Sequence, residues 1–158
     1  EHMAHNAVGA IAVAGVMGLD LQRAADAISM SVLSEMRMQH RTAISGALII
    51  DDSYNANPAS MAAALHALNA TKASRRIAVL GVMAELSEPD QDHLQISRLA
   101  KQLGIEVIAV ETDMYEVQSR TRDEVAAMLS TVENTATILI KGSRVAQLEK
   151  LVAILATP

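Results

Sequence analysis

The 158-residue chain contains no cysteine, tryptophan or phenylalanine and only two tyrosines. Without cysteine it can form neither a disulfide framework nor a thiolate metal site, which is compatible with the cytoplasmic protein that we expect. The scarcity of aromatic residues removes the stacking surfaces on which single-stranded nucleic acids bind. A formal net charge of -5 also argues against a phosphate backbone as partner, so we expect no nucleic-acid binding.

A hydrophobic run long enough to cross a membrane is missing as well. The most apolar stretch, residues 7–19, contains three glycines and is shorter than the roughly 20 residues that a spanning helix needs. It also lacks the basic start and cleavage site of a signal peptide, so we expect no membrane association. The chain begins with Glu1, in the middle of a continuing apolar pattern, and we expect it to be a fragment of a longer protein.

Two helices are expected before any strand. Residues 4–17 are apolar on nearly every face, which is typical of a helix buried on several sides. Asp20 can cap a second helix, whose apolar positions are Leu21, Ala25, Ile28 and Val32. Because these helices have no strand of their own, we expect them to end a preceding domain, with residues 34–36 as the hinge.

The rest of the chain alternates between strand and helix patterns. A hairpin is expected over residues 38–51 with its turn at Ser45 and Gly46. The spacing then predicts strands at 77–81, 107–110 and 138–140, separated by helices at 58–70, 90–103, 121–132 and 144–155, the last with Val145 facing inward. This order predicts an α/β fold: a doubly wound, mostly parallel sheet with helices on both faces and an edge hairpin.

The segment over residues 48–58, LIIDDSYNANP, is the corner around which the other segments are arranged. A buried strand runs into two acids, a polar turn and an Asn-Pro pair. Asn57 can cap the following helix, and Pro58 suits its first position because the N-H that proline lacks would have no partner there. The positive end of that helix would then favour anionic groups near the carboxyl end of the strand.

Three predicted strands end at Asp51-Asp52, Gly81-Val82 and Lys141-Gly142-Ser143, at the carboxyl ends where ligands bind in doubly wound sheets. Asp51 and Asp52 point to opposite faces, so either Asp52 is functional or both acids merely solvate the strand end. Lys141 can offer a charge to phosphate or carboxylate, and Ser143 can cap the last helix. No G-x-x-x-x-G-K-S loop exists in the chain, so we do not expect it to bind a nucleoside triphosphate alone.

No metal site is expected from the five histidines. They show neither an H-E-x-x-H motif nor a carboxylate-flanked pair, so they are interpreted as surface or capping residues. The nine methionines are interpreted as core filler.

Four short motifs together resemble the Mur ligases of peptidoglycan synthesis: DDSYNANP after a buried strand, EHMAHNA at the start, RM at residues 37–38, and KGSR at residues 141–144. The resemblance covers nearly the whole chain and corresponds to the last third or so of such an enzyme. It implies that residues 1–33 are the final helices of the central domain and residues 34–158 the Rossmann-like C-terminal domain. Met3 and Val82 depart from the family pattern.

The resemblance is strongest to the branch that adds D-alanyl-D-alanine to UDP-N-acetylmuramoyl-tripeptide through an acyl phosphate. It implies ATP and Mg as cofactors, with most of their ligands in the missing N-terminal and central domains, and a monomer that is inactive as this fragment. It assigns a catalytic role to Arg37, cofactor binding to Asn6, Arg37 and Asp52, and substrate binding to Asn55, Lys141 and Ser143.

Three alternatives remain open. Another Mur ligase or a folylpolyglutamate synthetase would share the fold and the reaction type. A receiver-type regulatory domain needs a phosphate-accepting aspartate at the end of a middle strand, where this chain has Leu80, Gly81 and Val82. A free-standing dinucleotide-binding module needs G-x-G-x-x-G after a strand, and the chain lacks that motif.

Overall fold

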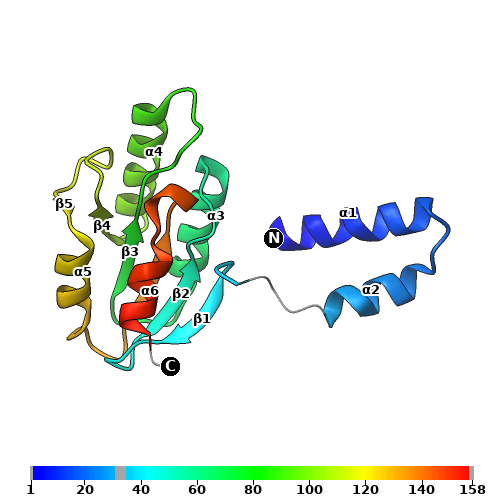
Figure 1. The fold of residues 1–158 in the computed structure, drawn as a ribbon, viewed down its shortest axis with the longest axis horizontal. Coiled ribbons are helices and arrows are strands. Elements are labelled where there is room, and N and C mark those ends of the chain that lie inside the picture. Colours follow the sequence, from blue (N-terminus) through cyan, green and yellow to red (C-terminus); the bar gives the residue numbers. More distant parts are fainter. Residues whose placement is uncertain (1, 31–34, 157–158) are drawn as a thin grey trace. The chain divides into compact units, whose positions relative to one another are not determined.

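The computed structural model describes residues 2–30 and 35–156, with side chains from residue 6 onward. The chain divides into two compact units, Glu1–Ser34 and Glu35–Pro158 (Figure 1). Of the predicted hinge, residue 34 lies outside the described residues, whereas Glu35 and Met36 belong to the second unit.

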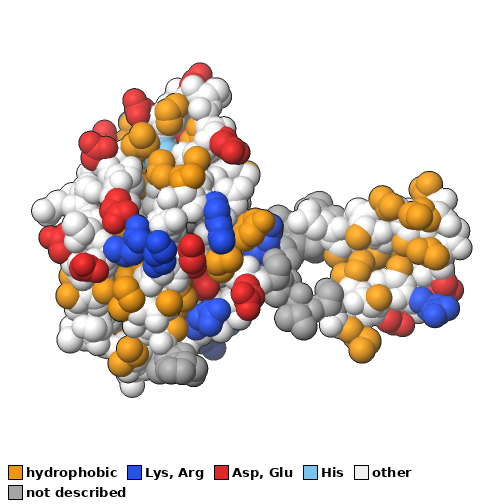
Figure 2. Space-filling view, viewed as in Figure 1, with side chains coloured by type: hydrophobic (Ala, Val, Ile, Leu, Met, Phe, Trp, Pro, Cys, Tyr) orange, Lys and Arg blue, Asp and Glu red, His pale blue; other side chains and the backbone are white. Residues whose placement is uncertain are grey.

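The first unit is a pair of helices, α1 (His2–Val16) and α2 (Leu21–Ser29). The predicted cap is confirmed, because an Asp20 carboxylate oxygen accepts the Arg23 N-H at 2.8 Å. Val8, Val13 and Val16 of α1 are 65%, 60% and 90% exposed, because α2 is too small to cover a helix that is apolar all round, and the burial of α1 against a preceding domain stays a prediction. Figure 2 shows apolar side chains gathered on the surface of this unit. Val32 lies outside the described residues.

The second unit is built on a six-stranded sheet with the order β1-β2-β6-β3-β4-β5. The edge strand β1 pairs antiparallel with β2, and the other pairs are parallel, which confirms the mostly parallel sheet and its edge hairpin. The short strand β5 at the other edge was not predicted, because two residues carry no periodic pattern. The strands are β1 (Gln39–Thr42), β2 (Leu48–Asp52), β3 (Arg76–Leu80), β4 (Glu106–Val110), β5 (Ser119–Arg120) and β6 (Thr137–Lys141).

Helices cover both faces of this sheet, as expected (Figure 1). On one face, α3 (Pro58–Asn69) and α4 (Pro89–Gln102) pack against Ile50, Ala78 and Leu139. On the other face, α5 (Arg122–Leu129) and α6 (Glu149–Leu155) pack against alternate residues of the same strands, Ile49, Ile77 and Ile138. Within the described residues, no helix is both long and apolar enough to cross a membrane.

The predicted helix over 144–155 is wrong in its first half. A 3-10 turn, η1 (Arg144–Ala146), is followed by Gln147 in the left-handed conformation (φ 49°), and only then does α6 begin. Val145, expected to face inward, is 70% exposed. The turn brings Ala146 so close to the end of β3 that a Cβ added at Gly81 would lie 2.7 Å from the Ala146 Cβ.

Gly81→Ala should therefore lower the free energy of unfolding by about 1–3 kcal/mol, because the added methyl group has no room between two packed segments. Urea unfolding of the chain measures this change. Ala127→Val adds methyl groups at an exposed position of α5 and should change the free energy of unfolding by less than about 1 kcal/mol. Equal losses in the two variants would contradict the close approach at Gly81.

Candidate functional site

The carboxyl ends of β2, β6 and β3 lie side by side, as the sequence predicted. Asp52 stands opposite Lys141 in the parallel register, and Lys141 stands opposite Leu80. Backbone bonds continue past the strands: the Gly81 N-H donates to the Lys141 carbonyl at 2.9 Å, and the Ser143 N-H donates to the Val82 carbonyl at 2.9 Å. The loops after β6 and β3 are thereby held together at the carboxyl end of the sheet.

The corner between β2 and α3 ends in the predicted cap. An Asn57 side-chain oxygen accepts the Ser60 N-H at 2.8 Å, and the Ser60 hydroxyl accepts the Asn57 N-H at 3.1 Å. Pro58 occupies the first position of α3, as expected. This reciprocal cap fixes where the loop over residues 53–56 ends.

Asp51 serves the fold. Its side chain is 1% exposed, and it accepts hydrogen bonds from the Ser53 hydroxyl at 2.6 Å and the Ser53 N-H at 3.2 Å. The Arg41 guanidinium lies 3.5 Å away on the edge strand. The alternative in which both acids solvate the strand end is therefore wrong.

Asp52 forms a buried ion pair with Lys141. The Lys141 ammonium donates to one Asp52 carboxylate oxygen at 2.5 Å and to the Asn55 carbonyl at 2.9 Å, while the other Asp52 oxygen accepts the Met38 N-H at 3.1 Å. The Lys141 side chain is 3% exposed and the Asp52 side chain is 12% exposed. The Lys141 charge is thus neutralised inside the fold, and its contact with an incoming substrate stays a prediction that requires this pair to open.

Ser143 occupies the position before η1 but does not cap it, contrary to expectation. Its hydroxyl accepts the Ala84 N-H at 2.8 Å and donates to the Ala56 carbonyl at 3.2 Å. The hydroxyl therefore joins the corner after β2 to the loop after β3, and it is 3% exposed.

The exposed part of the site is basic and aromatic. The Arg37 guanidinium lies 4.3 Å from the centre of the Tyr54 ring, and the Arg144 guanidinium lies 5.9 Å from it. Tyr54 is 42% exposed, and Asn55 beside it is exposed as well. Two guanidinium groups around one aromatic ring favour an anionic or planar ligand. A hollow of about 340 Å³ lies here, lined by Tyr54, Asn55, Ala84, Glu85, Ser143, Arg144 and Val145.

His93 was missed by the sequence analysis. It is fully buried, not a surface or capping residue as expected. Its Nε2 accepts the Met83 N-H at 2.8 Å, so the ring proton resides on Nδ1, which donates to the Pro89 carbonyl at 2.5 Å. The spacing of His93, Ile96 and Ala100 on one helical face was a signal that could have indicated this burial.

Tyr115 supports the same loop from another side. Its hydroxyl donates to the Gly81 carbonyl at 2.8 Å, and its ring meets the His93 ring edge to face at 4.9 Å. His93 and Tyr115 together position the loop after β3 that carries Ala84 and Glu85 into the hollow.

Burial raises the pKa of the Tyr115 hydroxyl above its ordinary value near 10. The unfolded chain loses this proton above about pH 10 whereas the folded chain keeps it, so its contribution to stability is present below about pH 10 and is lost as the pH rises further. In a Tyr54→Phe variant, which leaves Tyr115 as the chain's single tyrosine, phenolate absorbance should appear only as the chain unfolds. Phenolate formation at about pH 10 with unchanged circular dichroism would contradict this burial.

The remaining expected site residue, Asn6, is exposed on α1 in the first unit, and its contact with adenine stays a prediction. The Met3 side chain lies outside the described residues. Among the side chains that the structure describes, no group of three His, Cys, Asp or Glu could hold a metal ion.

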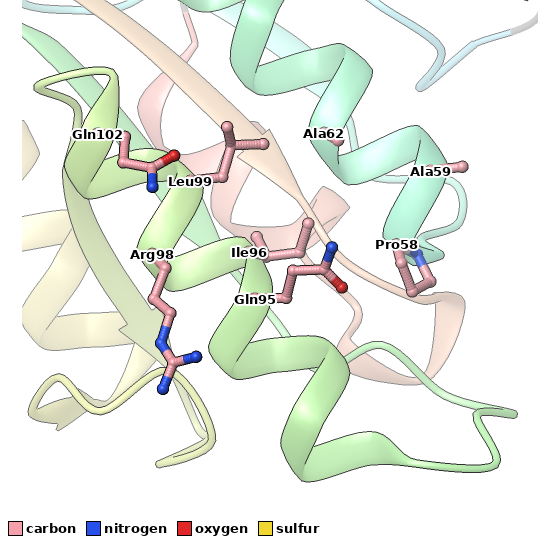
Figure 3. Close-up of a pocket in the computed structure, with 8 residues that line it drawn as sticks. All are labelled: Pro58, Ala59, Ala62, Gln95, Ile96, Arg98, Leu99 and Gln102. Carbon is pink, nitrogen blue, oxygen red and sulfur yellow. The ribbon is translucent and has the colours of Figure 1, made fainter.

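A second hollow, of about 460 Å³, opens between α3 and α4 (Figure 3). Pro58, Ala59, Ile96 and Leu99 give it an apolar lining, and Arg98 is the one charged residue along it. With no cluster of titratable side chains, this hollow offers no groups for acid-base chemistry.

Comparison with known proteins shows where the chain belongs. The family model described as Mur ligase, glutamate ligase domain matches residues 36–156. The chain is 42% identical over 117 residues to the UDP-N-acetylmuramoyl-tripeptide--D-alanyl-D-alanine ligase of Mycobacterium bovis, covering 70% of this chain and 23% of that protein. It is 36% identical over 118 residues to the Escherichia coli protein of the same name, covering 66% of this chain and 26% of that protein.

Solved structures agree with the sequence relatives. A crystal structure of MurF from Acinetobacter baumannii matches with a TM-score of 0.84 at 27% identity, over 96% of this chain and 36% of that one. The chain spans about a quarter of the length of the curated relatives named above. Since the family model covers more than half of the chain, this protein belongs to the Mur ligase family, through its glutamate ligase domain.

Proposed function

We propose that this chain is the C-terminal part of an ATP-dependent ligase that adds D-alanyl-D-alanine to UDP-N-acetylmuramoyl-tripeptide, through an acyl phosphate, in peptidoglycan precursor synthesis. The observation that carries the proposal is the 42% identity to a ligase of that name, over a segment that includes the corner between β2 and α3. The exposed Arg37 and Arg144 around Tyr54 support it, since the reaction handles anionic groups.

In this proposal residues 1–33 end the central domain and residues 34–158 form the C-terminal domain. The family model begins at residue 36, close to the boundary between the two compact units. The exposed apolar side chains of α1 support the assignment, because the body of a central domain would remove them from water. The missing N-terminal and central domains are then the partners of this chain, in a cytoplasmic monomer.

ATP supplies the phosphoryl group that turns an unreactive carboxylate into an electrophile. Arg37 is the residue of this chain best placed for its terminal phosphate, because its guanidinium is exposed and stands on an aromatic ring. Asp52 fits the ribose less well, since both of its carboxylate oxygens already accept hydrogen bonds. Asn6 would contact adenine, and the ligands of Mg would come from residues outside this chain.

The amino substrate would meet the exposed surface between Asn55 and Ser143. Asn55 is the more accessible of the two, whereas the Ser143 hydroxyl is occupied by Ala84 and Ala56. We infer that Asn55 contacts the substrate and that Ser143 shapes the hollow beside it. Bringing this surface against the central domain would also exclude water from a reactive intermediate.

A second candidate is another amide-forming ligase of the same superfamily. The family description, which names a glutamate ligase domain, favours this alternative. The two candidates differ in the amino substrate and can be separated by the product. The receiver-type alternative gains no support, because the end of β3 at Gly81 and Val82 carries no acid.

The test uses the intact protein that contains this chain, supplied with ATP, Mg and UDP-N-acetylmuramoyl-tripeptide. Phosphate release and the mass of the product are measured with D-alanyl-D-alanine, L-glutamate or meso-diaminopimelate as the amino substrate. We expect an amide product with D-alanyl-D-alanine alone. A product with glutamate would support the second candidate, and the absence of any ATP-dependent product would overturn the ligase proposal. The 158-residue chain alone should show no turnover, since it lacks a phosphate-binding loop.

A further inference from the structure

Residues 36–38, at the start of the second unit, hold an unusual backbone. Met36 and Met38 adopt positive φ angles of 61° and 50°, a conformation that residues with a side chain rarely adopt. Arg37 lies between them. Such a backbone persists only where its surroundings hold it, so the contacts of this segment decide where Arg37 points.

The corner after β2 supplies three of those contacts, beside the Arg144 guanidinium, which donates to the Met36 sulfur at 3.4 Å. The Met38 N-H donates to an Asp52 carboxylate oxygen at 3.1 Å, and the Tyr54 N-H donates to the Met36 carbonyl at 3.1 Å. The Arg37 guanidinium then stacks on the Tyr54 ring at 4.3 Å. Each of these three contacts depends on the place of Asp52 and of the residues just after it.

Lys141 fixes that place from the next strand. Its ammonium bonds the second Asp52 oxygen and also the Asn55 carbonyl, so it holds both sides of the segment that contains Tyr54. Its side chain is 3% exposed, which leaves little of it for an incoming molecule. This buried ammonium thus connects β6 to the segment that carries Arg37.

We propose that Lys141 is a positioning residue for Arg37: by holding Asp52 and the Asn55 carbonyl, it keeps residues 36–38 in the strained conformation that stacks Arg37 on Tyr54. This role differs from the substrate contact expected for Lys141 from the sequence. The positioning is a property of the second unit, and only its consequence for phosphate binding by Arg37 rests on the proposed function.

The test measures hydrogen exchange of the Met38 amide and the ring-current shift of the Arg37 Hδ protons by NMR, in the 158-residue chain without ligand. Two variants disturb the connection. Lys141→Met removes the ammonium, and Asp52→Asn presents one oxygen where two donors, the Lys141 ammonium and the Met38 N-H, each need an acceptor. Leu129→Ala is the matched control, because it removes buried side-chain volume on α5, away from the corner.

We expect the Met38 amide to exchange about 10–100-fold faster in both variants than in the control, after correction for differences in the free energy of unfolding. The reason is that the hydrogen bond from the Met38 N-H to the Asp52 carboxylate is weakened or lost. The Arg37 Hδ shift should lose at least half of its ring-current contribution. Leu129→Ala should change neither signal. Tyr54→Leu should abolish the ring-current shift outright and so confirms its source.

Unchanged Met38 exchange and Arg37 shifts in folded Lys141→Met would overturn the proposal. If that variant does not fold, Asp52→Asn decides, and unchanged signals there overturn it equally. Equal changes in the Leu129→Ala control would also overturn it, because they would mark a general loss of stability. None of these readouts needs ATP or turnover, so they stand or fail independently of the ligase assay.

Discussion

Lys141→Met should lower the free energy of unfolding of this chain by about 3–5 kcal/mol, the usual result of removing one partner from a buried ion pair. The reason is the charge left behind: the Asp52 side chain is 12% exposed and would lose the Lys141 ammonium, its oppositely charged partner. The Asn55 carbonyl would lose its donor at the same time. Urea denaturation followed by circular dichroism measures the loss.

Two further variants identify the source of this loss. Lys150→Met removes an exposed ammonium that bonds Gln147, and should change the free energy of unfolding by no more than about 0.5 kcal/mol. Adding Asp52→Leu to Lys141→Met should restore part of the loss, because the uncompensated charge is then gone. The losses in free energy of unfolding of Lys141→Met and Asp52→Leu are also measured singly. If the loss in the double variant equals their sum, the buried charge is not the cause.

Arg37→Ala should lower kcat of the proposed intact ligase about 100–1000-fold, the typical effect of removing one preorganised group that stabilises charge in a transition state. The free energy of unfolding should fall by no more than about 1 kcal/mol, because an exposed guanidinium over an aromatic ring contributes little to stability. Steady-state phosphate release and urea denaturation measure the two quantities.

Matched variants separate this effect from a general change in surface charge. Arg98→Ala removes an exposed guanidinium on α4, along the apolar hollow, and should leave kcat unchanged. Arg37→Lys keeps the charge but loses the planar group, so we expect a kcat between those of the native enzyme and of Arg37→Ala. A kcat for Arg37→Ala within about threefold of the native value would remove Arg37 from the catalytic proposal.

Lys141→Met and Arg37→Ala test two different functions of the corner. Arg37 is exposed and should affect catalysis with little effect on folding, whereas Lys141 is buried and should affect both. A parallel loss of kcat and stability in Lys141→Met, beside a selective loss of kcat in Arg37→Ala, is the pattern expected if one residue positions the other.

Much of the fold was predictable because its signals are local. The caps at Asp20 and Asn57 depend on residues three positions away, and the strand and helix periods depend on the same short windows. The edge hairpin was signalled by its Ser45-Gly46 turn. The alternation of the remaining strands and helices then left a mostly parallel sheet as the consistent arrangement.

The break between η1 and α6 had no such signal, because it depends on a close approach between segments far apart in the chain. Ala146 packs against Gly81, and a helical period over residues 144–155 contains no information about that neighbour. The burial of His93 differs, because its helical spacing to Ile96 and Ala100 was a local signal, whereas its bonds to the Met83 N-H and the Pro89 carbonyl became known only from the structure.

Local chemistry along the chain therefore settles which residues can stand at the strand ends: two acids and a polar turn in one place, a lysine and a serine in another. The packed fold determines which of them meet. Asp52 and Lys141 are 89 residues apart, and only the parallel pairing of β2 with β6 brings their charges together and takes them out of water. The Lys141 charge is thereby paired inside the fold, and the exposed guanidinium groups of Arg37 and Arg144 are the accessible charges around Tyr54.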